Sequence, residues 1–185
     1  APIIVNDTGP AFHPRDLAQN RLSGDAWECY PFPMGDPQAL DRVRQELLRI
    51  SQDPKADLAE GALWISVLET PDLVMDDYLQ WLSQTASHAR ANIAQLDAPG
   101  LLAVLRGELK FRGDDQNYYD ARNSCLDQVI DRRRGIPITL SLIYLTLALR
   151  IGEDAAGVNA PGHFLVRHGE TIVDPFRGEL MSPEA

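Results

Sequence analysis

Residues 132–139 read Arg132-Arg133-Arg134-Gly135-Ile136-Pro137-Ile138-Thr139 and open an almost wholly apolar segment that runs to Leu149. Proline is well tolerated in the first turn of a helix, because an N–H at that position has no partner within the helix. We therefore predict a helix from Pro137 to Arg150, which Gly152 ends. Since this helix is apolar on nearly all sides, we expect it to be buried within the protein.

The chain before this segment divides into an irregular leader and a helical region. Residues 1–37 hold six of the thirteen prolines and show no sustained periodicity, which predicts a leader without regular structure. Over residues 38–110, apolar side chains recur at steps of three and four, which is typical of helices. The predicted helices cover 40–48, 58–68, 76–96 and a short segment after Pro99-Gly100. The helical region should therefore form a subdomain ahead of the buried helix.

The polar and aromatic segment 114–120 is predicted to be a loop. Asn123 or Ser124 is placed to cap a short helix that follows it, and Gly135 would end that helix. After Gly152, three short runs of residues favour β-strands, namely 155–158, 163–167 and 171–173. The turn His168-Gly169-Glu170 predicts that the last two runs form a hairpin.

Composition excludes several functional classes. With 185 residues and 44% hydrophobic content, the chain can bury one good core. A net charge of −10 with only two lysines is a poor match to nucleic acid, and the longest apolar run is too short to cross a membrane. The start of the chain has neither the basic flank nor the apolar length of a signal peptide. We predict a cytoplasmic protein that binds neither nucleic acid nor membrane.

The cysteines and histidines indicate neither disulfides nor a metal site. Cys29 and Cys125 are far apart and form no paired metal-binding spacing, so we expect reduced thiols, no metal and no cofactor. We expect His13, His88 and His168 to be exposed. No two histidines share a metal-ligand spacing with a carboxylate, which also predicts that the chain binds no metal.

The order of three features along the chain is that of a cysteine-nucleophile active site. A thiolate is favoured at the start of a buried helix, because the helix dipole and free N–H groups lower the pKa of the thiol. A histidine then acts as the base, and an acid fixes its tautomer. Here His163 begins one strand of the hairpin and Asp174 ends the other, but the helix start offers Pro137 instead of a nucleophile.

Six short motifs in this order resemble the transglutaminase-like family of SirB-type bacterial proteins, over roughly Leu58 to the end of the chain. They are Phe111-Arg112-Gly113, Tyr118-Tyr119-Asp120, Asn123-Ser124, Arg133-Arg134-Gly135-Ile136-Pro137-Ile138, Pro161-Gly162-His163-Phe164 and Asp174-Pro175-Phe176. The resemblance implies an α+β, papain-like core over residues 111–185, with a central helix on a small antiparallel sheet. In that core, His163 matches the histidine of a Cys-His-Asp triad, Asp174 matches the acid, and Pro137 stands at the position of the cysteine. The resemblance also implies that the natural chain continues into a helical repeat segment.

Because proline has no nucleophilic side chain, the sequence favours a non-catalytic domain that uses the old cleft for binding or regulation. The alternative is a residual cysteine-type hydrolase or acyltransferase in which His163 and Asp174 act with Cys125 or a water molecule. Both residues also have a structural interpretation, as a strand-end pair in which Asp174 simply begins a turn. A third possibility is a regulator that acts through the acidic helical region.

The expected partner is a protein or peptide, and the oligomeric state stays open. Tyr118, Tyr119 and Asn123 are candidates to line the cleft, or else they pack the loop onto the core. Arg134 is a candidate to bind an anionic group with its two neighbours. Otherwise the three arginines stabilise the end of the preceding helix and pair with Asp127 and Asp131.

Overall fold

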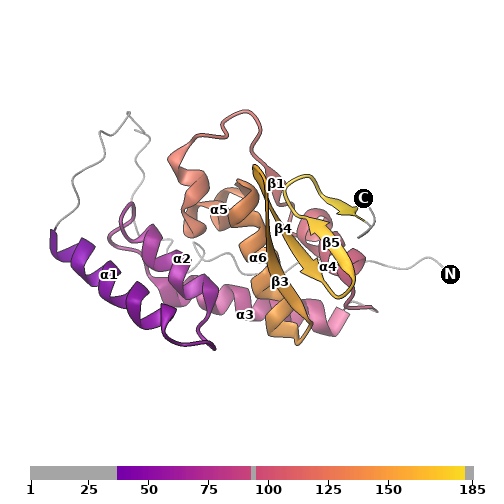
Figure 1. Cartoon of the computed structure of the whole chain (residues 1–185), viewed down its shortest axis with the longest axis horizontal. Helices are drawn as coiled ribbons and strands as arrows, with labels where there is room; N and C mark the ends of the chain where they lie inside the picture. Colours follow the sequence, from indigo (N-terminus) through magenta and orange to yellow (C-terminus); the bar gives the residue numbers. More distant parts are fainter. Residues whose placement is uncertain (1–36, 93–94, 182–185) are drawn as a thin grey trace.

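The computed structural model describes residues 37–92 and 95–181 (Figure 1), so most of the predicted leader over 1–37 lies outside the described residues. The helices are α1 (Pro37–Ser51), α2 (Leu58–Ser66), α3 (Met75–Asn92), α4 (Ala98–Ala103), α5 (Leu126–Arg132) and α6 (Pro137–Ile151). The strands are β1 (Arg112–Gly113), β2 (Arg134–Gly135), β3 (Ala155–Ala160), β4 (His163–His168), β5 (Thr171–Asp174) and β6 (Glu179–Met181). The prediction of a mixed helical and sheet fold is confirmed.

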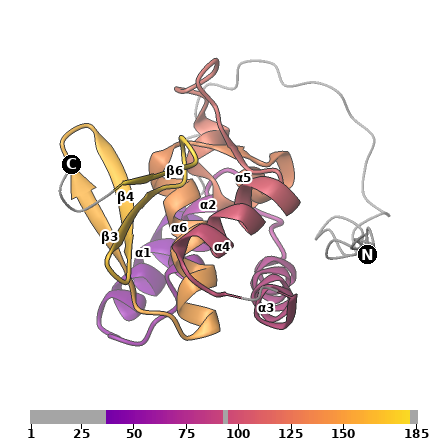
Figure 2. The same cartoon turned by 90° about the vertical axis from the view of Figure 1, so that its right-hand side faces the viewer.

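Helix α6 lies at the centre of the molecule. Figure 2 shows the strands on one side of α6 and α3 and α4 on the other, and α6 also packs against α2 and α5. Pro137 is the first residue of α6, and Gly152 ends the helix in the left-handed conformation with φ of 93°. Eleven of the fifteen residues of α6 are buried, because protein surrounds the helix as its apolar sequence predicts.

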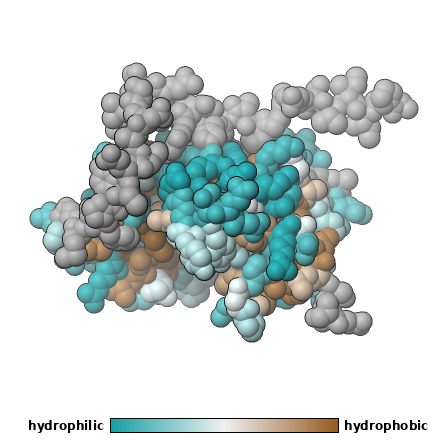
Figure 3. All heavy atoms as spheres, turned by 90° about the horizontal axis from the view of Figure 1, so that it is seen from above, coloured by the Kyte–Doolittle hydropathy of each residue, from teal (hydrophilic) through white to brown (hydrophobic). Residues whose placement is uncertain are grey.

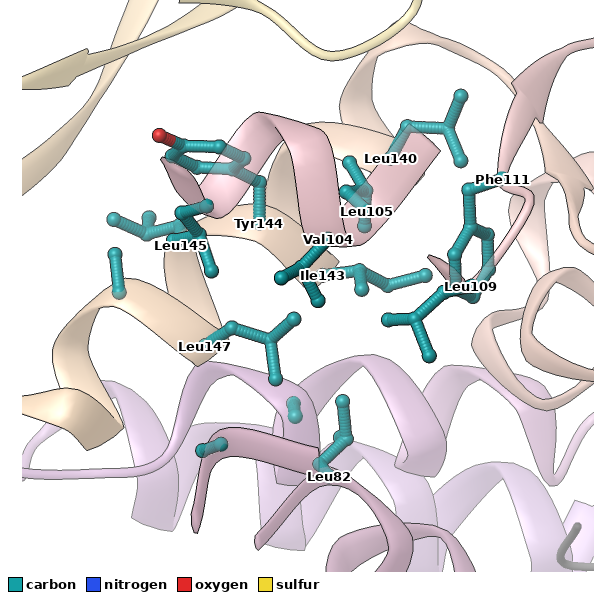
Figure 4. Close-up of a cluster of buried hydrophobic side chains, with 14 of the residues drawn as sticks. Leu82, Val104, Leu105, Leu109, Phe111, Leu140, Ile143, Tyr144, Leu145 and Leu147 are labelled. Carbon is teal, nitrogen blue, oxygen red and sulfur yellow. The ribbon is translucent and has the colours of Figure 1, made fainter. Parts of the chain in front are cut away.

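The core is formed where α6 meets α3, α4 and the π-helix Val104–Glu108 that continues α4. Figure 4 shows leucine side chains from several elements packed together with Ile143, Tyr144 and Phe111. Trp81 of α3 packs edge to face on Phe111, with 6.3 Å between the ring centroids. The helical subdomain and the later part of the chain therefore share one hydrophobic core.

The four-stranded sheet is antiparallel, in the order β3-β4-β5-β6. Gly169, with φ of 57°, makes the turn between β4 and β5, so the predicted hairpin is confirmed. Strand β6 was not predicted from the sequence, because its three residues are all exposed and show no alternation. Strands β1 and β2 add a separate parallel pair of two residues each, which was not predicted either.

Several predicted boundaries need correction. Arg133, not Gly135, ends α5 in the left-handed conformation, with φ of 58°. Neither Asn123 nor Ser124 caps α5, because both belong to a 3-10 helix over Ala121–Ser124 and the cap position is Cys125. The helix predicted over 76–96 runs over Met75–Asn92.

The expectation that His168 is exposed is wrong. Its side chain is buried, and Nδ1 lies 2.8 Å from the hydroxyl oxygen of Tyr144. His88 is half-buried, while His13 lies outside the described residues. Over residues 37–92 and 95–181, each helix is too short or too polar to traverse a lipid bilayer.

Candidate functional site

His163 and Asp174 form a hydrogen-bonded pair at one end of the sheet. His163 begins β4 and Asp174 ends β5, and because these strands are antiparallel their ends meet. The distance from His163 Nε2 to Asp174 Oδ2 is 2.7 Å. A carboxylate accepts hydrogen bonds, so the neutral imidazole that donates to Asp174 has its proton on Nε2 and its lone pair on Nδ1. The imidazole is thus oriented with its basic nitrogen directed away from the carboxylate.

Asp174 also holds the turn that follows it. Its Oδ1 accepts hydrogen bonds from the backbone N–H groups of Phe176 and Arg177, each at 3.0 Å. The guanidinium of Arg106 donates to the carbonyl oxygens of Phe176 and Arg177 and fixes the same turn from outside. Asp174, which is only 2% exposed, therefore binds His163 with one carboxylate oxygen and stabilises the turn with the other.

The start of α6 lies at the same end of the fold as His163. Ser141 Oγ donates to the carbonyl oxygen of Phe164 at 3.0 Å, and farther along, Tyr144 contacts His168. Two contacts in the same order along both elements mean that α6 and β4 run in parallel. Pro137, one turn before Ser141, is therefore at the end of α6 that belongs with His163.

A hydrogen-bond network fixes the chain around Pro137. Thr139 Oγ1 accepts the N–H of Ile136 at 3.1 Å and donates to the carbonyl oxygen of Asn123 at 2.9 Å. The side chain of Asn123 is fully buried and donates to the carbonyl oxygen of Asn117 at 2.7 Å. Asn123 thus anchors the loop, and as a binding candidate it is not accessible to a partner.

Cys125 lies at the start of α5, which is a different helix from the one that Pro137 begins. The residue is only 4% exposed. Burial raises the pKa of the thiol to about 12, and the negative charges of Asp127 and Glu69 add to this effect. At neutral pH the thiol is therefore protonated, whereas a nucleophile has to be a thiolate.

Aromatic rings extend from His163 to the surface. Phe176 lies 6.1 Å from the imidazole of His163, Tyr118 lies 6.2 Å from Phe176, and Tyr119 lies 5.3 Å from Tyr118, all edge to face. We call these four side chains the aromatic row. Tyr119 is 95% exposed and Tyr118 is 39% exposed, so the outer part of the row faces solvent.

The aromatic row depends on a glycine and on a polar loop. A Cβ atom on Gly113 would lie 2.7 Å from the ring of Phe176, so a glycine is required beneath that ring. The loop that carries both tyrosines rises between β1 and α5 at the top of Figure 1. Seen from above in Figure 3, the middle of this face is mostly hydrophilic. The loop at the top of Figure 1 therefore lies on a largely polar face.

The three arginines have three different environments. Arg132 donates to Asn123 Oδ1 at 2.9 Å and lies 3.8 Å from Asp114. Arg133 stacks on the rings of Trp81 and Phe111, and burial lowers its pKa to about 10. Arg134 alone is exposed.

The predicted pairing of these arginines with Asp127 is wrong. Asp127 instead accepts hydrogen bonds from Thr70 and Gln128. Within the described part of the chain, no three His, Cys, Asp or Glu side chains come together as they would around a metal ion.

Sequence reasoning did not single out three residues that shape this site. Phe176 links the imidazole to the tyrosines, Arg106 clamps the turn after Asp174, and Ser141 aligns α6 with β4. Phe176 belongs to the motif Asp174-Pro175-Phe176, so a signal for it was present. Arg106 and Ser141 carry no such signal, because their partners are backbone carbonyl oxygens.

Comparison with known proteins identifies the family. Residues 75–185 match the model of the transglutaminase-like superfamily, which is more than half of the chain. The chain belongs to the transglutaminase-like superfamily. In this superfamily member, the matched range includes α6, the sheet and the His163–Asp174 pair. It also includes α3, α4 and the π-helix. No solved structure matches the chain.

The relatives include bacterial and eukaryotic proteins. A UPF0162 protein of Xylella fastidiosa is 36% identical over 135 residues, which cover 68% of this chain and 48% of that protein. A UPF0162 protein of Vibrio cholerae is 31% identical over 138 residues, covering 68% of this chain and 50% of that protein. The mouse F-box only protein 21 is 50% identical over 64 residues, which are 35% of this chain and 10% of that protein. The chain spans about half the length of these bacterial relatives.

Proposed function

We propose that this chain is a non-catalytic transglutaminase-like domain of the SirB type, which binds a protein or peptide partner at the His163 end of α6. The observation that carries the proposal is Pro137, the first residue of α6, at the end of the helix that belongs with the His163–Asp174 pair. A proline there begins the helix well, but it has no atom that can attack a carbonyl group. The oriented imidazole therefore has no thiol at the first position of this helix, and the hydroxyl of Thr139 in the same turn donates to the carbonyl oxygen of Asn123.

The state of Cys125 supports this proposal. It is the one cysteine among the described residues, and burial raises the pKa of its thiol to about 12. Its sulfur lies 3.8 Å from the carbonyl oxygen of Ala121, to which the thiol can donate as a weak hydrogen bond. A buried, protonated thiol that packs within the core serves stability better than catalysis.

The exposed end of the aromatic row is the proposed binding surface. Tyrosine supplies a large contact area at a low cost in conformational entropy, which is why it is enriched in protein interfaces. Tyr119 is almost fully exposed, and Arg134, also exposed, follows the left-handed Arg133 that ends α5. Neither side chain contributes to the hydrophobic core.

A peptide display selection tests the proposal. We expect the purified chain to select peptides whose affinity falls at least about tenfold in Tyr119→Ala, because exposed aromatic side chains dominate binding energy. The melting temperature of this variant should stay unchanged, since Tyr119 is exposed. Leu48→Ala, which removes an exposed apolar side chain from α1, is the matched control and should keep the affinity. Equal losses in both variants, or a loss only on charge reversals in α1, would instead favour a regulator that acts through the helical region.

A residual hydrolase or acyltransferase is the second candidate, because His163 Nδ1 keeps the lone pair that a general base needs. Here a water molecule, or Cys125 after a rearrangement, would be the nucleophile. Hydrolysis of activated esters and amides should then exceed the buffer rate and disappear in His163→Ala. Persistence of that activity in Cys125→Ala would assign the attack to water. Activity equal to the buffer rate in the unmodified chain would leave only the binding function.

A further inference from the structure

A pocket of about 430 Å³ adjoins the aromatic row. Three arginines line it, Arg106, Arg112 and Arg177, together with Phe176. Phe176 is also the ring that contacts His163, so one side chain joins the pocket to the His163–Asp174 pair. We call this feature the arginine pocket.

Positive charge in the arginine pocket is compensated only in part, by Asp115 and Glu179 in its lining and by Asp174, whose charge also acts on Arg106. Arg112 directs Nη1 to the carbonyl oxygens of Arg106 and Phe111, and within the described residues neither Arg106 nor Arg112 has a carboxylate at ion-pair distance. The pKa of Arg106 is lowered, first by burial and then by the charge of Arg112. Two guanidinium groups thus repel each other at one wall of the pocket.

Arg177 adds a third positive charge with free donors. Its Nε lies 3.9 Å from Asp174 Oδ2, but that carboxylate already accepts from His163 and from two backbone N–H groups. The side chain of Arg177 is 67% exposed, so most of its guanidinium group faces solvent. A planar guanidinium with free N–H groups matches the two oxygen atoms of a carboxylate.

The two acids of the pocket limit the charge of its ligand. Asp115 and Glu179 also line the pocket, and the chain as a whole carries a net charge of −10. A phosphodiester chain would bring several negative charges against this acidic surface. The donors of Arg106 are used by the turn after Asp174, so a single carboxylate needs only Arg112 and Arg177, and the charge balance favours an acidic side chain of a peptide.

We propose that the arginine pocket binds an aspartate or glutamate side chain of a partner peptide, whose neighbouring apolar residues lie along the aromatic row. This inference rests on the proposed binding function and names the chemical class of its partner. The peptide crosses Phe176, with its carboxylate between Arg112 and Arg177 and its apolar part toward Tyr118. The pocket thereby determines which peptides the row accepts.

The display selection can test the charge of the ligand directly. Selected peptides should be enriched in Asp and Glu over the starting library. Replacing that acid by its amide in a selected, fluorescein-labelled peptide should weaken binding about tenfold, since a hydrogen bond to a charged group is lost. Arg177→Gln should weaken binding of the acidic peptide by a similar factor and leave binding of the amide peptide unchanged. Arg44→Gln, which removes an exposed charge from α1, is the matched control and should have no effect.

The outcomes separate this inference from the proposed function. Selected peptides that depend on Tyr119 but show neither acid enrichment nor sensitivity to Arg177→Gln would overturn the inference and leave the binding function intact. Failure to select any peptide would overturn both. A labelled oligodeoxythymidine that binds as tightly as the peptides, with the same dependence on Arg177, would assign the pocket to nucleic acid and overturn the peptide ligand. Displacement of the peptide by inorganic phosphate as readily as by free glutamate would also contradict a carboxylate pocket.

Discussion

Helices α5 and α6 begin within twelve residues of each other along the chain, yet a cysteine stands at the start of α5 and a proline at the start of α6. The start of α5 has a thiol, Cys125, which is buried and faces the carbonyl oxygen of Ala121. The start of α6 has a proline in place of a thiol, but it lies at the end of the fold that holds His163 and Asp174. The thiol therefore lies at one helix start, and the His163–Asp174 pair lies at the end of the fold where the other helix begins.

The difference shows that a catalytic constellation depends on which residues meet, and not on which residues occur. Thr139 Oγ1 ties the two regions together, because it accepts the N–H of Ile136 before α6 and donates to the carbonyl oxygen of Asn123 before α5. This connection holds both helix starts in place. Exchanging their chemistry by mutation is the direct way to test the comparison.

The largest expected effect concerns the reactivity of Cys125. In a Cys29→Ser background, Cys125 is the single thiol of the chain. Its pKa of about 12, against an ordinary value of 9.0, lowers the thiolate fraction at pH 7.5 by about a thousandfold. We expect labelling by a disulfide reagent to be slower in the folded chain than in the urea-unfolded chain by at least that factor. A folded-state rate within about tenfold of the unfolded rate would restore Cys125 as a nucleophile.

The second prediction places a thiol on the other helix start. Position 137 is buried like Cys125, but the free N–H groups of α6 stabilise a thiolate there, so Pro137→Cys with both native cysteines replaced should react about a hundredfold faster than Cys125. His163→Gln should slow this reaction severalfold and shift its pH profile upward. The matched control is Ile138→Cys, which is also in the first turn but is 52% exposed. Its thiol should react readily, at a rate that His163→Gln does not change. If His163→Gln slowed both thiols equally, the proposed geometry would be contradicted.

The third prediction concerns the glycine before α6. A Cβ atom on Gly135 would lie 2.7 Å from Thr139 Oγ1 and 2.8 Å from Val129 Cγ1. Neither neighbour can yield easily, since Thr139 holds two hydrogen bonds and Val129 is buried in the core. Gly135→Ala should therefore lower the free energy of unfolding by about 2 kcal/mol in urea denaturation. Gly107→Ala is the control, because a Cβ there meets no atom within 4 Å, and its stability should be unchanged or slightly higher.

The central helix α6 could be predicted from its own residues. Pro137, the apolar run after it and Gly152 define α6 locally, so the sequence alone predicts the helix and both of its ends. The hairpin and the meeting of His163 with Asp174 also follow, because a tight turn at Gly169 leaves little freedom in how the strands pair.

The rest depends on contacts between residues far apart in the chain. Arg133 adopts a positive φ where α5 ends, and its guanidinium stacks on Trp81 and Phe111, which local sequence cannot reveal. Local sequence likewise gave no sign that His168 is buried beside Tyr144. The accessibility of Tyr119, in contrast to buried Asn123, is decided by how the loop packs. Candidate binding residues could therefore be named from the sequence but not separated into exposed and structural ones.

The smallest effect is a pH dependence of stability that belongs to Cys125. Its folded pKa of about 12 lies above the ordinary value of 9.0, so the unfolded chain loses the thiol proton first as the pH rises. The unfolded state then binds fewer protons than the folded state, and stability falls above pH 9 until the folded thiol also ionises near pH 12. Between pH 8 and pH 10 this single group should cost about 1 kcal/mol.

Lysine and tyrosine residues also begin to titrate in this range, so the quantity to measure is a difference. The free energy of unfolding is determined by urea at both pH values for the Cys29→Ser chain and for the same chain with Cys125→Ala. The alanine variant lacks the thiol, and its loss between pH 8 and pH 10 should be smaller by about 1 kcal/mol. Identical losses in the two chains would mean that the thiol at the start of α5 is already accessible to solvent and ionises as in the unfolded chain. The two helix starts would then differ only in their position relative to His163, and not in burial of the thiol.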